Sequence, residues 1–159
     1  MAGTLPGPDG KARCRWCSIA PEFPAYHDKV ARFTTRDVAR LLKDDGIVRH
    51  RGKIEAVINN ARRAQEAVAE YGSLAAFFWR YEPDAKLLAK PQTASVSAEA
   101  IAFLKHLKKL GWAFVGPTTI YAFMQAAGLI NDHAEGCLIR PKADKARKSF
   151  KRPAVKRKG

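Results

Sequence analysis

The stretch LKKLGWAFVGPTTIYAFMQAAGLINDH, residues 107–133, predicts two helices joined by a tight hairpin between glycines. We expect the first helix to begin after the N-cap residue Ser97 and to end at Gly111, because glycine readily adopts the left-handed backbone that closes a helix. Gly116 and Pro117 mark the start of the second helix, since proline in a first turn loses no helical hydrogen bond. The apolar residues between the two glycines are expected to fill the hairpin: Trp112, Phe114 and Val115.

The start of the second helix is a candidate anion site. The backbone amides around Gly116 and Thr118 have no partner inside a helix, and the helix dipole places positive potential in front of them. A DNA phosphate would fit such a position. The same residues also fit an ordinary pair of helices joined by a glycine turn, and the pattern alone does not choose between the two interpretations. Gly128 is expected to end the second helix.

Helical patterns continue on the N-terminal side of this pair. Thr34 or Thr35 is expected to cap a helix that reaches Gly46, and a longer helix is expected over residues 51–71. Ser73 is expected to cap a further helix, whose aromatic residues favour a buried core over a base-stacking surface. No alternating apolar pattern indicates a sheet, and no repeat or linker divides the chain. The predicted fold class is therefore all-α.

Potential metal ligands lie towards both ends of the chain. Cys14 and His27 are near the N-terminus, and His133 and Cys137 are near the C-terminus. Two sulfurs and two imidazoles are the ligand set of a closed structural zinc site. If the segment around His133 is helical, its ring and the Cys137 thiol share one helix face. The alternative is that these residues are scattered and that any one cysteine is a buried free thiol.

The charge of the chain favours a polyanionic partner. Its 159 residues include 29 Lys and Arg against 15 Asp and Glu, a formal net charge of +14 at pH 7. The length suits one domain, with residues 1–12 as a flexible N-terminus and residues 142–159 as a basic tail that we expect to be disordered. We interpret the tail as a contact for DNA backbone, with an aid to solubility as the alternative. No stretch is long enough to span a membrane.

Four stretches carry a resemblance to a known family: RCRW (13–16), AYHD (25–28), GIVRHRGKIEAVINNAR (46–62) and WAFVGPTTIYAFMQAAGLINDHAEGC (112–137). In them the chain resembles DNA-3-methyladenine glycosylase I, a bacterial family of the helix-hairpin-helix glycosylase class. The resemblance implies one glycosylase-like domain over residues 13–141, in which a zinc snap joins the N- and C-terminal segments.

The resemblance also implies the zinc ligands. It carries them over onto two cysteines and two histidines: Cys14, His27, His133 and Cys137. Cys17 is then an extra thiol, although a ligand pair of Cys14 with Cys17 is chemically plausible. The zinc would be structural, because four protein ligands leave no open position for water.

The resemblance is interrupted after Asp28. The family continues there with a Glu-Trp-Gly segment and with helices containing Glu-Gly-x-Gln-Ala-Gly-Leu-Ser-Trp, whereas this chain passes directly to a part that matches the family further on. The absent block carries a glutamate and a tryptophan of the family's base pocket. Tyr26 corresponds to a family tyrosine that lines the same pocket.

The function implied is base-excision repair. A monofunctional hydrolase of this kind rotates 3-methyladenine out of alkylated double-stranded DNA and cleaves its N-glycosidic bond. A cytoplasmic, nucleoid-associated bacterial monomer is implied with it. The alternative, because the pocket block is absent, is a non-catalytic zinc-stapled DNA-binding module that has lost the lesion pocket.

Overall fold

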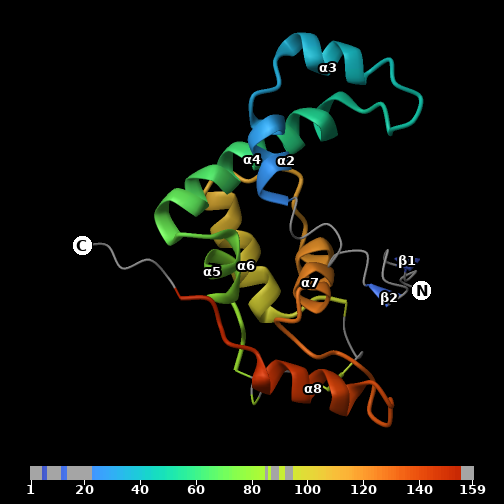
Figure 1. Cartoon of the computed structure of the whole chain (residues 1–159), viewed down its shortest axis with the longest axis vertical. Helices are drawn as coiled ribbons and strands as arrows, with labels where there is room; N and C mark the ends of the chain where they lie inside the picture. Colours follow the sequence, from blue (N-terminus) through green and yellow to red (C-terminus); the bar gives the residue numbers. More distant parts are fainter. Residues whose placement is uncertain are drawn as a thin grey trace. The chain divides into compact units, whose positions relative to one another are not determined.

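The computed structural model describes residues 5–6, 12–13, 23–84, 86, 90–91 and 95–154, with side chains described from His27 onward. The described regular structure is helical except for one short antiparallel pair, β1 (Leu5–Pro6) with β2 (Ala12–Arg13). Seven helices follow it in Figure 1: α2 (Phe23–Ala31), α3 (Thr35–Leu41), α4 (Arg51–Tyr71), α5 (Leu74–Trp79), α6 (Ala98–Lys109), α7 (Pro117–Ala126) and α8 (Arg140–Ser149). The prediction of an essentially helical fold is confirmed.

The chain forms two compact units, residues 1–65 and residues 66–159, and α4 contributes to both. The single glycosylase-like domain over residues 13–141 stays a prediction. No helix among the described residues has the length and apolar character needed to cross a membrane.

The first unit is built around a small apolar cluster between α3 and α4. Val38, Ile54 and Ile58 are buried in it. The backbone amide and hydroxyl of Thr34 both donate to the Asp37 carboxylate, at 2.8 and 2.9 Å, which fixes the start of α3 where the sequence placed it.

The end of α3 differs from the prediction. The helix stops at Leu41 rather than continuing to Gly46. Beyond Leu41 the amides of Lys43 and Asp44 donate to carbonyls three residues back, and the Asp44 carboxylate accepts the Gly46 amide at 2.9 Å. A local aspartate turn therefore replaces the last predicted helical turn.

The second unit holds the main core, which α5, α6 and α7 enclose. Its five fully buried large side chains are Phe77, Phe103, Leu107, Met124 and Leu129. Tyr81 stacks on Phe103 with ring centroids 3.9 Å apart and planes 13° apart. The aromatic residues after Ser73 thus form core, as the sequence predicted.

Both helices of the α6–α7 pair end as their sequence predicts. Gly111 has φ 78°, and the amides of Gly111 and Trp112 donate to the carbonyls of Lys108 and Leu107. This is a Schellman closure, and Gly128 (φ 76°) closes α7 in the same way. The Ser97 hydroxyl accepts the Ala100 amide at 3.1 Å and caps α6.

The C-terminal segment forms a helix instead of the disordered tail that its composition predicts, so that prediction is wrong for α8. Arg147 donates to the Glu82 carboxylate at 2.9 Å, and Arg152 donates to both oxygens of the same carboxylate, at 2.7 and 3.0 Å. Phe150 packs against Trp79 with ring centroids 4.6 Å apart. We call this set of contacts the Glu82 anchor; its partner residues are about 70 positions apart in the chain, so local composition could not reveal it.

Candidate nucleic-acid interface and metal pair

The connection between α6 and α7 is a short hairpin whose apolar residues do not all point inward. Trp112 and Val115 are partly buried against the core of the second unit. Phe114 is 64% exposed and has φ 55°, so the expectation that it fills the hairpin is wrong. The hairpin therefore carries two inward apolar anchors and one outward aromatic ring.

The first turn of α7 presents backbone amides without a side-chain cap. Gly116 is the N-cap residue, with φ −123° and ψ 164°, and no side chain caps the helix there. Pro117 occupies the first turn and has no N–H, so the amides of Thr118 and Thr119 are the donors at this end.

The structure also shows what Gly116 does not do. A Cβ built there would lie 3.9 Å from the Thr119 hydroxyl oxygen, an ordinary contact, and its backbone lies in a region that every residue adopts. Neither space nor conformation inside the chain requires glycine at this position. Close approach of an external group to the α7 amides would require it.

Asp132 lies just beyond α7 and connects back to that helix. Its carboxylate accepts a hydrogen bond from Gln125 at 2.6 Å. Burial raises the pKa of the neighbouring Tyr121 phenol, and the Asp132 carboxylate raises that pKa further. Asp132 thus ties the loop that carries His133 back to α7.

Two of the four expected metal ligands lie together. His133 and Cys137 lie in a turn and not on a helix, with Gly136 at φ 81° between them. The turn places the Cys137 sulfur 3.9 Å from His133 Nδ1. The expected juxtaposition is present, but a turn produces it.

The other two expected ligands are less completely described. His27 lies in α2, its side chain is 11% exposed, and its Nε2 is 3.8 Å from the Asp28 carboxylate. Cys14 and the extra thiol Cys17 lie outside the described residues. Within the described part of the chain, no group of three or more His, Cys, Asp and Glu residues is placed to hold a metal ion.

The proposed pocket residue Tyr26 also lies in α2, and its side chain is outside the described set. α2 passes through Asp28 to Ala31 without a break, and α3 begins at Thr35. The chain therefore continues as helix after Asp28, at the position where the resemblance places the family's segment with the pocket glutamate and tryptophan.

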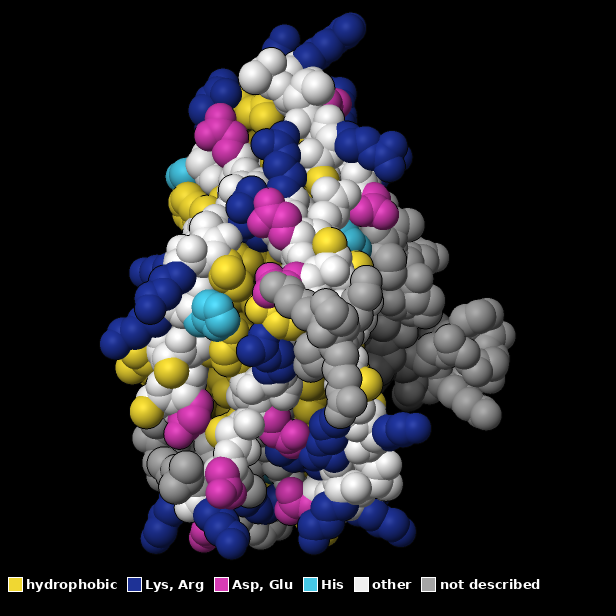
Figure 2. Space-filling view, turned by 90° about the vertical axis from the view of Figure 1, so that its left-hand side faces the viewer, with side chains coloured by type: hydrophobic (Ala, Val, Ile, Leu, Met, Phe, Trp, Pro, Cys, Tyr) yellow, Lys and Arg dark blue, Asp and Glu magenta, His cyan; other side chains and the backbone are white. Residues whose placement is uncertain are grey.

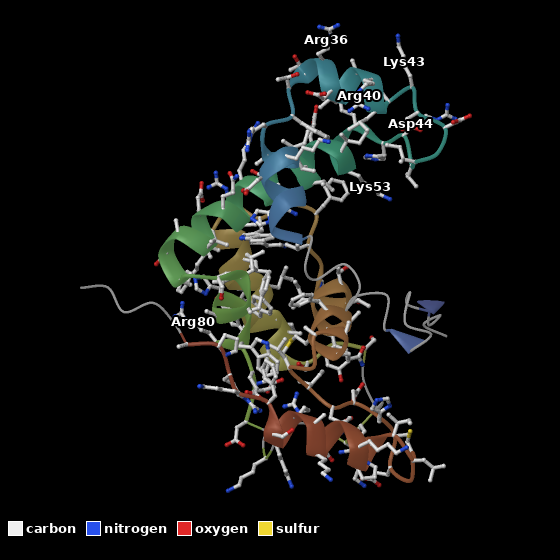
Figure 3. All side chains as sticks on the ribbon, in the orientation of Figure 1. Arg36, Arg40, Lys43, Asp44, Lys53 and Arg80 are labelled. Carbon is white, nitrogen blue, oxygen red and sulfur yellow. The ribbon has the colours of Figure 1, made fainter. Side chains whose placement is uncertain are left out.

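A basic helix face that the sequence analysis did not identify lies in the first unit. Arg36, Arg40 and Lys43, which Figure 3 labels, are exposed along α3 and just beyond its end, whereas Val38 of the same helix is buried. The i, i+4, i+7 spacing of these cations was the available signal. Figure 2 shows Lys and Arg side chains at many places on the described part of the visible face, with fewer acidic side chains among them.

Known proteins share this fold. The chain is 33% identical to the 3-methyladenine DNA glycosylase I of Staphylococcus aureus in a structure of its 3-methyladenine recognition, which it matches with a TM-score of 0.63 over 77% of this chain and 69% of that one. It is 34% identical to a Tyr-to-Phe variant of 3-methyladenine DNA glycosylase I in complex with 3-methyladenine, with a TM-score of 0.64 over 77% of this chain and 69% of that one. The helical fold is thus that of solved 3-methyladenine DNA glycosylases I.

Sequence comparison identifies the family. The methyladenine glycosylase family matches residues 16–140. The chain is also 42% identical over 119 residues to DNA-3-methyladenine glycosylase 1 of Escherichia coli strain K12, covering 71% of this chain and 63% of that protein. The chain belongs to the methyladenine glycosylase family. It spans less than two thirds of the length of the E. coli relative.

Proposed function

We propose that this chain is a DNA glycosylase that hydrolyses the N-glycosidic bond of 3-methyladenine in alkylated double-stranded DNA. The observation that carries the proposal is the family match over residues 16–140, which includes both α2 and the complete α6–α7 pair. The net charge of +14 supports a nucleic-acid substrate.

In this proposal the α6–α7 connection acts as the hairpin of a helix-hairpin-helix motif. The amides of Thr118 and Thr119 hold one phosphate, and Gly116 lets it approach closely. The exposed cations of α3 add contacts to the backbone that carry no sequence information. Such contacts suit an enzyme that must bind a lesion in any sequence.

The chemistry requires little acid–base help from the protein. The reacting bond is hidden in the duplex, so the lesion must be rotated out of the stack. The methylated base is cationic and leaves readily, and water replaces it at the sugar, which gives an abasic site. The pocket then mainly selects and positions the base. Because α2 continues through Asp28 where the family's pocket glutamate and tryptophan would follow, we expect slower excision than in the longer relatives.

We also propose that a structural zinc ion joins the two ends of the domain through Cys14, His27, His133 and Cys137. In a tetrahedral site with bonds of about 2.0 Å to nitrogen and about 2.3 Å to sulfur, the two ligand atoms are about 3.5 Å apart. The 3.9 Å between Cys137 Sγ and His133 Nδ1 is near that value, so this pair fits the metal with a small adjustment. The ion would stabilise the fold and take no part in bond cleavage.

The decisive experiment measures release of free 3-methyladenine from methylated duplex DNA, with the E. coli relative as positive control and unmethylated duplex as negative control. Duplex binding is measured on the same preparation. Release above the unmethylated control supports the proposed activity. Binding without release instead supports the alternative of a non-catalytic DNA-binding module, and absence of both contradicts the proposed function. Sedimentation of the same sample tests the expected monomer.

A further inference from the structure

The connection between α3 and α4 exposes two neighbouring aliphatic side chains. Ile47 is 41% exposed and Val48 is 70% exposed, and every residue from Lys43 to Arg51 is exposed with them. Turns and solvated loops are usually built from glycine, proline and small polar residues, so a pair of aliphatic residues at such a place needs a reason. We call Ile47 and Val48 the α3–α4 tip.

Hydrogen bonds on both sides hold the tip in place. Before it, the Asp44 carboxylate accepts the Gly46 amide at 2.9 Å. After it, the His50 amide donates to the Val48 carbonyl at 2.9 Å, which closes a γ-turn. The His50 ring also accepts the Lys53 amide at 3.2 Å, at the start of α4. A fixed backbone therefore presents the two aliphatic side chains outward.

Packing inside the first unit does not account for the tip. The apolar cluster of this unit buries Val38, Ile54 and Ile58, and the tip is not among the residues that pack against it. Single exposed aliphatic residues are common on protein surfaces. Two neighbours on a fixed turn instead form a small apolar surface, which contributes to binding in proportion to the area that a partner covers.

The charge around the tip selects the partner. Four cations and two acidic residues lie between Lys43 and Lys53. Figure 3 shows Lys43 extending from the end of α3 and Lys53 from the start of α4. A second copy of this chain, with its net charge of +14, would be repelled. Duplex DNA is complementary, because the deoxyribose walls of its minor groove are apolar and lie between two rows of phosphates.

We propose that the α3–α4 tip contacts duplex DNA in the minor groove, where Ile47 and Val48 pack against deoxyribose and the cations beside them reach phosphates. The minor groove is about 6 Å wide, so it admits a narrow turn but no helix. Aliphatic side chains have no hydrogen-bonding group, so this contact reads no base edge and fits any sequence. The inference rests on the proposed function and adds to it an apolar DNA contact in the first unit.

The first test compares Val48→Asp with Val57→Asp in duplex binding. Val57 is a matched control, because it is also an exposed valine of the first unit (58%) and its replacement changes the net charge equally. Val48→Asp should raise Kd at least roughly tenfold, since it places a carboxylate against phosphates, whereas Val57→Asp should raise Kd by less than about threefold. The Tm of both variants should stay within about 2 °C of the parent, because both sites are exposed.

Val48→Ala isolates the apolar contribution. It should raise Kd by about threefold to tenfold, because less apolar area is covered, and it should leave the slope of log Kd against log salt unchanged, because no phosphate contact is removed. Hydroxyl-radical cleavage then locates the contact, since these radicals attack the deoxyribose hydrogens that face the minor groove. The probe is a duplex with one abasic-site analogue, which resembles the proposed product. At saturation the parent and Val57→Asp should protect a run of sugars that Val48→Ala leaves more open.

Three results would overturn the inference. They are equal affinities of Val48→Asp and Val57→Asp, a cleavage pattern that Val48→Ala leaves unchanged, and a large fall in the Tm of Val48→Ala, which would assign the tip a structural role. A parent that sediments as a dimer and a Val48→Asp variant that sediments as a monomer would assign the tip to a contact between copies instead.

Release of 3-methyladenine by the same samples separates this test from the proposed function. A parent that binds and releases the base while the Val48 variants bind equally well contradicts the inference alone. A parent that binds duplex without release contradicts the glycosylase activity, and the comparison of Val48 with Val57 still decides the inference. A parent that does not bind duplex overturns both.

Discussion

Replacing Gly116 with valine should weaken DNA binding without unfolding the protein. Gly116 has φ −123° and ψ 164°, a β-region conformation that suits a β-branched residue. Its Cβ would lie 3.9 Å from the nearest atom, so the substitution introduces no internal clash at that atom. Valine is a poorer N-cap residue than glycine, which lowers stability. Valine also restricts the backbone of the unfolded chain more than glycine does, which raises stability. These effects oppose each other, and the free energy of unfolding should change by no more than about 1 kcal/mol.

The effect on binding should be much larger. Added methyl groups in front of the Thr118 and Thr119 amides would keep a phosphate from hydrogen-bonding distance. A hydrogen bond to a charged group contributes about 1.5–3 kcal/mol, so loss of one such bond should raise Kd by about 10-fold to about 150-fold. The assay is fluorescence anisotropy with a labelled duplex at several salt concentrations, and the weakening should persist at each of them.

Ala126→Val is the matched control. Ala126 is exposed at the other end of α7, so the variant adds a similar apolar bulk and costs only a few tenths of a kcal/mol in helix propensity. It should bind DNA like the parent. If Gly116→Val also binds like the parent, no phosphate approaches the start of α7 and the hairpin proposal is wrong.

Three further predictions concern the anchor, the metal and the charge. The Arg152 hydrogen bonds hold the pKa of Glu82 below its ordinary value, so the carboxylate stabilises the fold above about pH 4.3 and this contribution is lost as pH falls through the lowered pKa. Glu82→Gln should therefore lower the Tm by about 2–6 °C at pH 7, with the difference closing towards pH 3; a constant difference would contradict the ionic contribution. Cys137→Ser should lower zinc content and Tm together, because structural zinc binding is coupled to folding, and full zinc occupancy in a variant lacking both Cys14 and Cys137 would refute the ligand assignment. The exposed lysines of α8 are Lys142, Lys145 and Lys148. Replacing them with glutamine should reduce the slope of log Kobs against log salt by up to about 0.9 for each phosphate contact removed. An unchanged slope would show that α8 faces away from DNA.

Local signals in the sequence predicted most helix boundaries because they act within a few residues. Ser97 and Gly111 bound α6 through hydrogen bonds to groups no more than five positions away. The same holds for Ser73, whose hydroxyl accepts the Ala76 amide. The long helix α4 also has the predicted bounds, residues 51–71. Capping chemistry of this kind is readable without knowledge of the tertiary structure.

The features that sequence analysis missed depend on partners far away in the chain, or on a side chain that competes with the helix for a backbone hydrogen bond. The Glu82 anchor joins α8 to residues far away in the chain, so the basic composition of that segment misleadingly indicated disorder. α3 ends early because the Asp44 side chain competes for a backbone amide. Phe114 reads as an apolar hairpin residue, and only the backbone geometry shows that the ring points outward.

The sequence predicted the candidate site only in part, because it shows spacing between nearby residues but not contacts between distant ones. The His133 and Cys137 spacing anticipated their proximity although the expected helix is a turn, because a tight turn also brings residues four positions apart together. The basic face of α3 was visible as a spacing but was not separated from the general excess of cations. The zinc ligand set as a whole, and the role of Tyr26, stay predictions.

The Glu82 anchor has a consequence for where this protein can be cut. The family match ends at residue 140, which makes Arg140 the natural C-terminal boundary for an expression clone designed from the family alone. A clone that stops there would keep Glu82, with its side chain 20% exposed, and would remove both guanidinium partners. It would also uncover the Trp79 ring that Phe150 now packs against. The smallest stable version of the second unit should therefore extend through Arg152, twelve residues beyond the boundary that homology would choose.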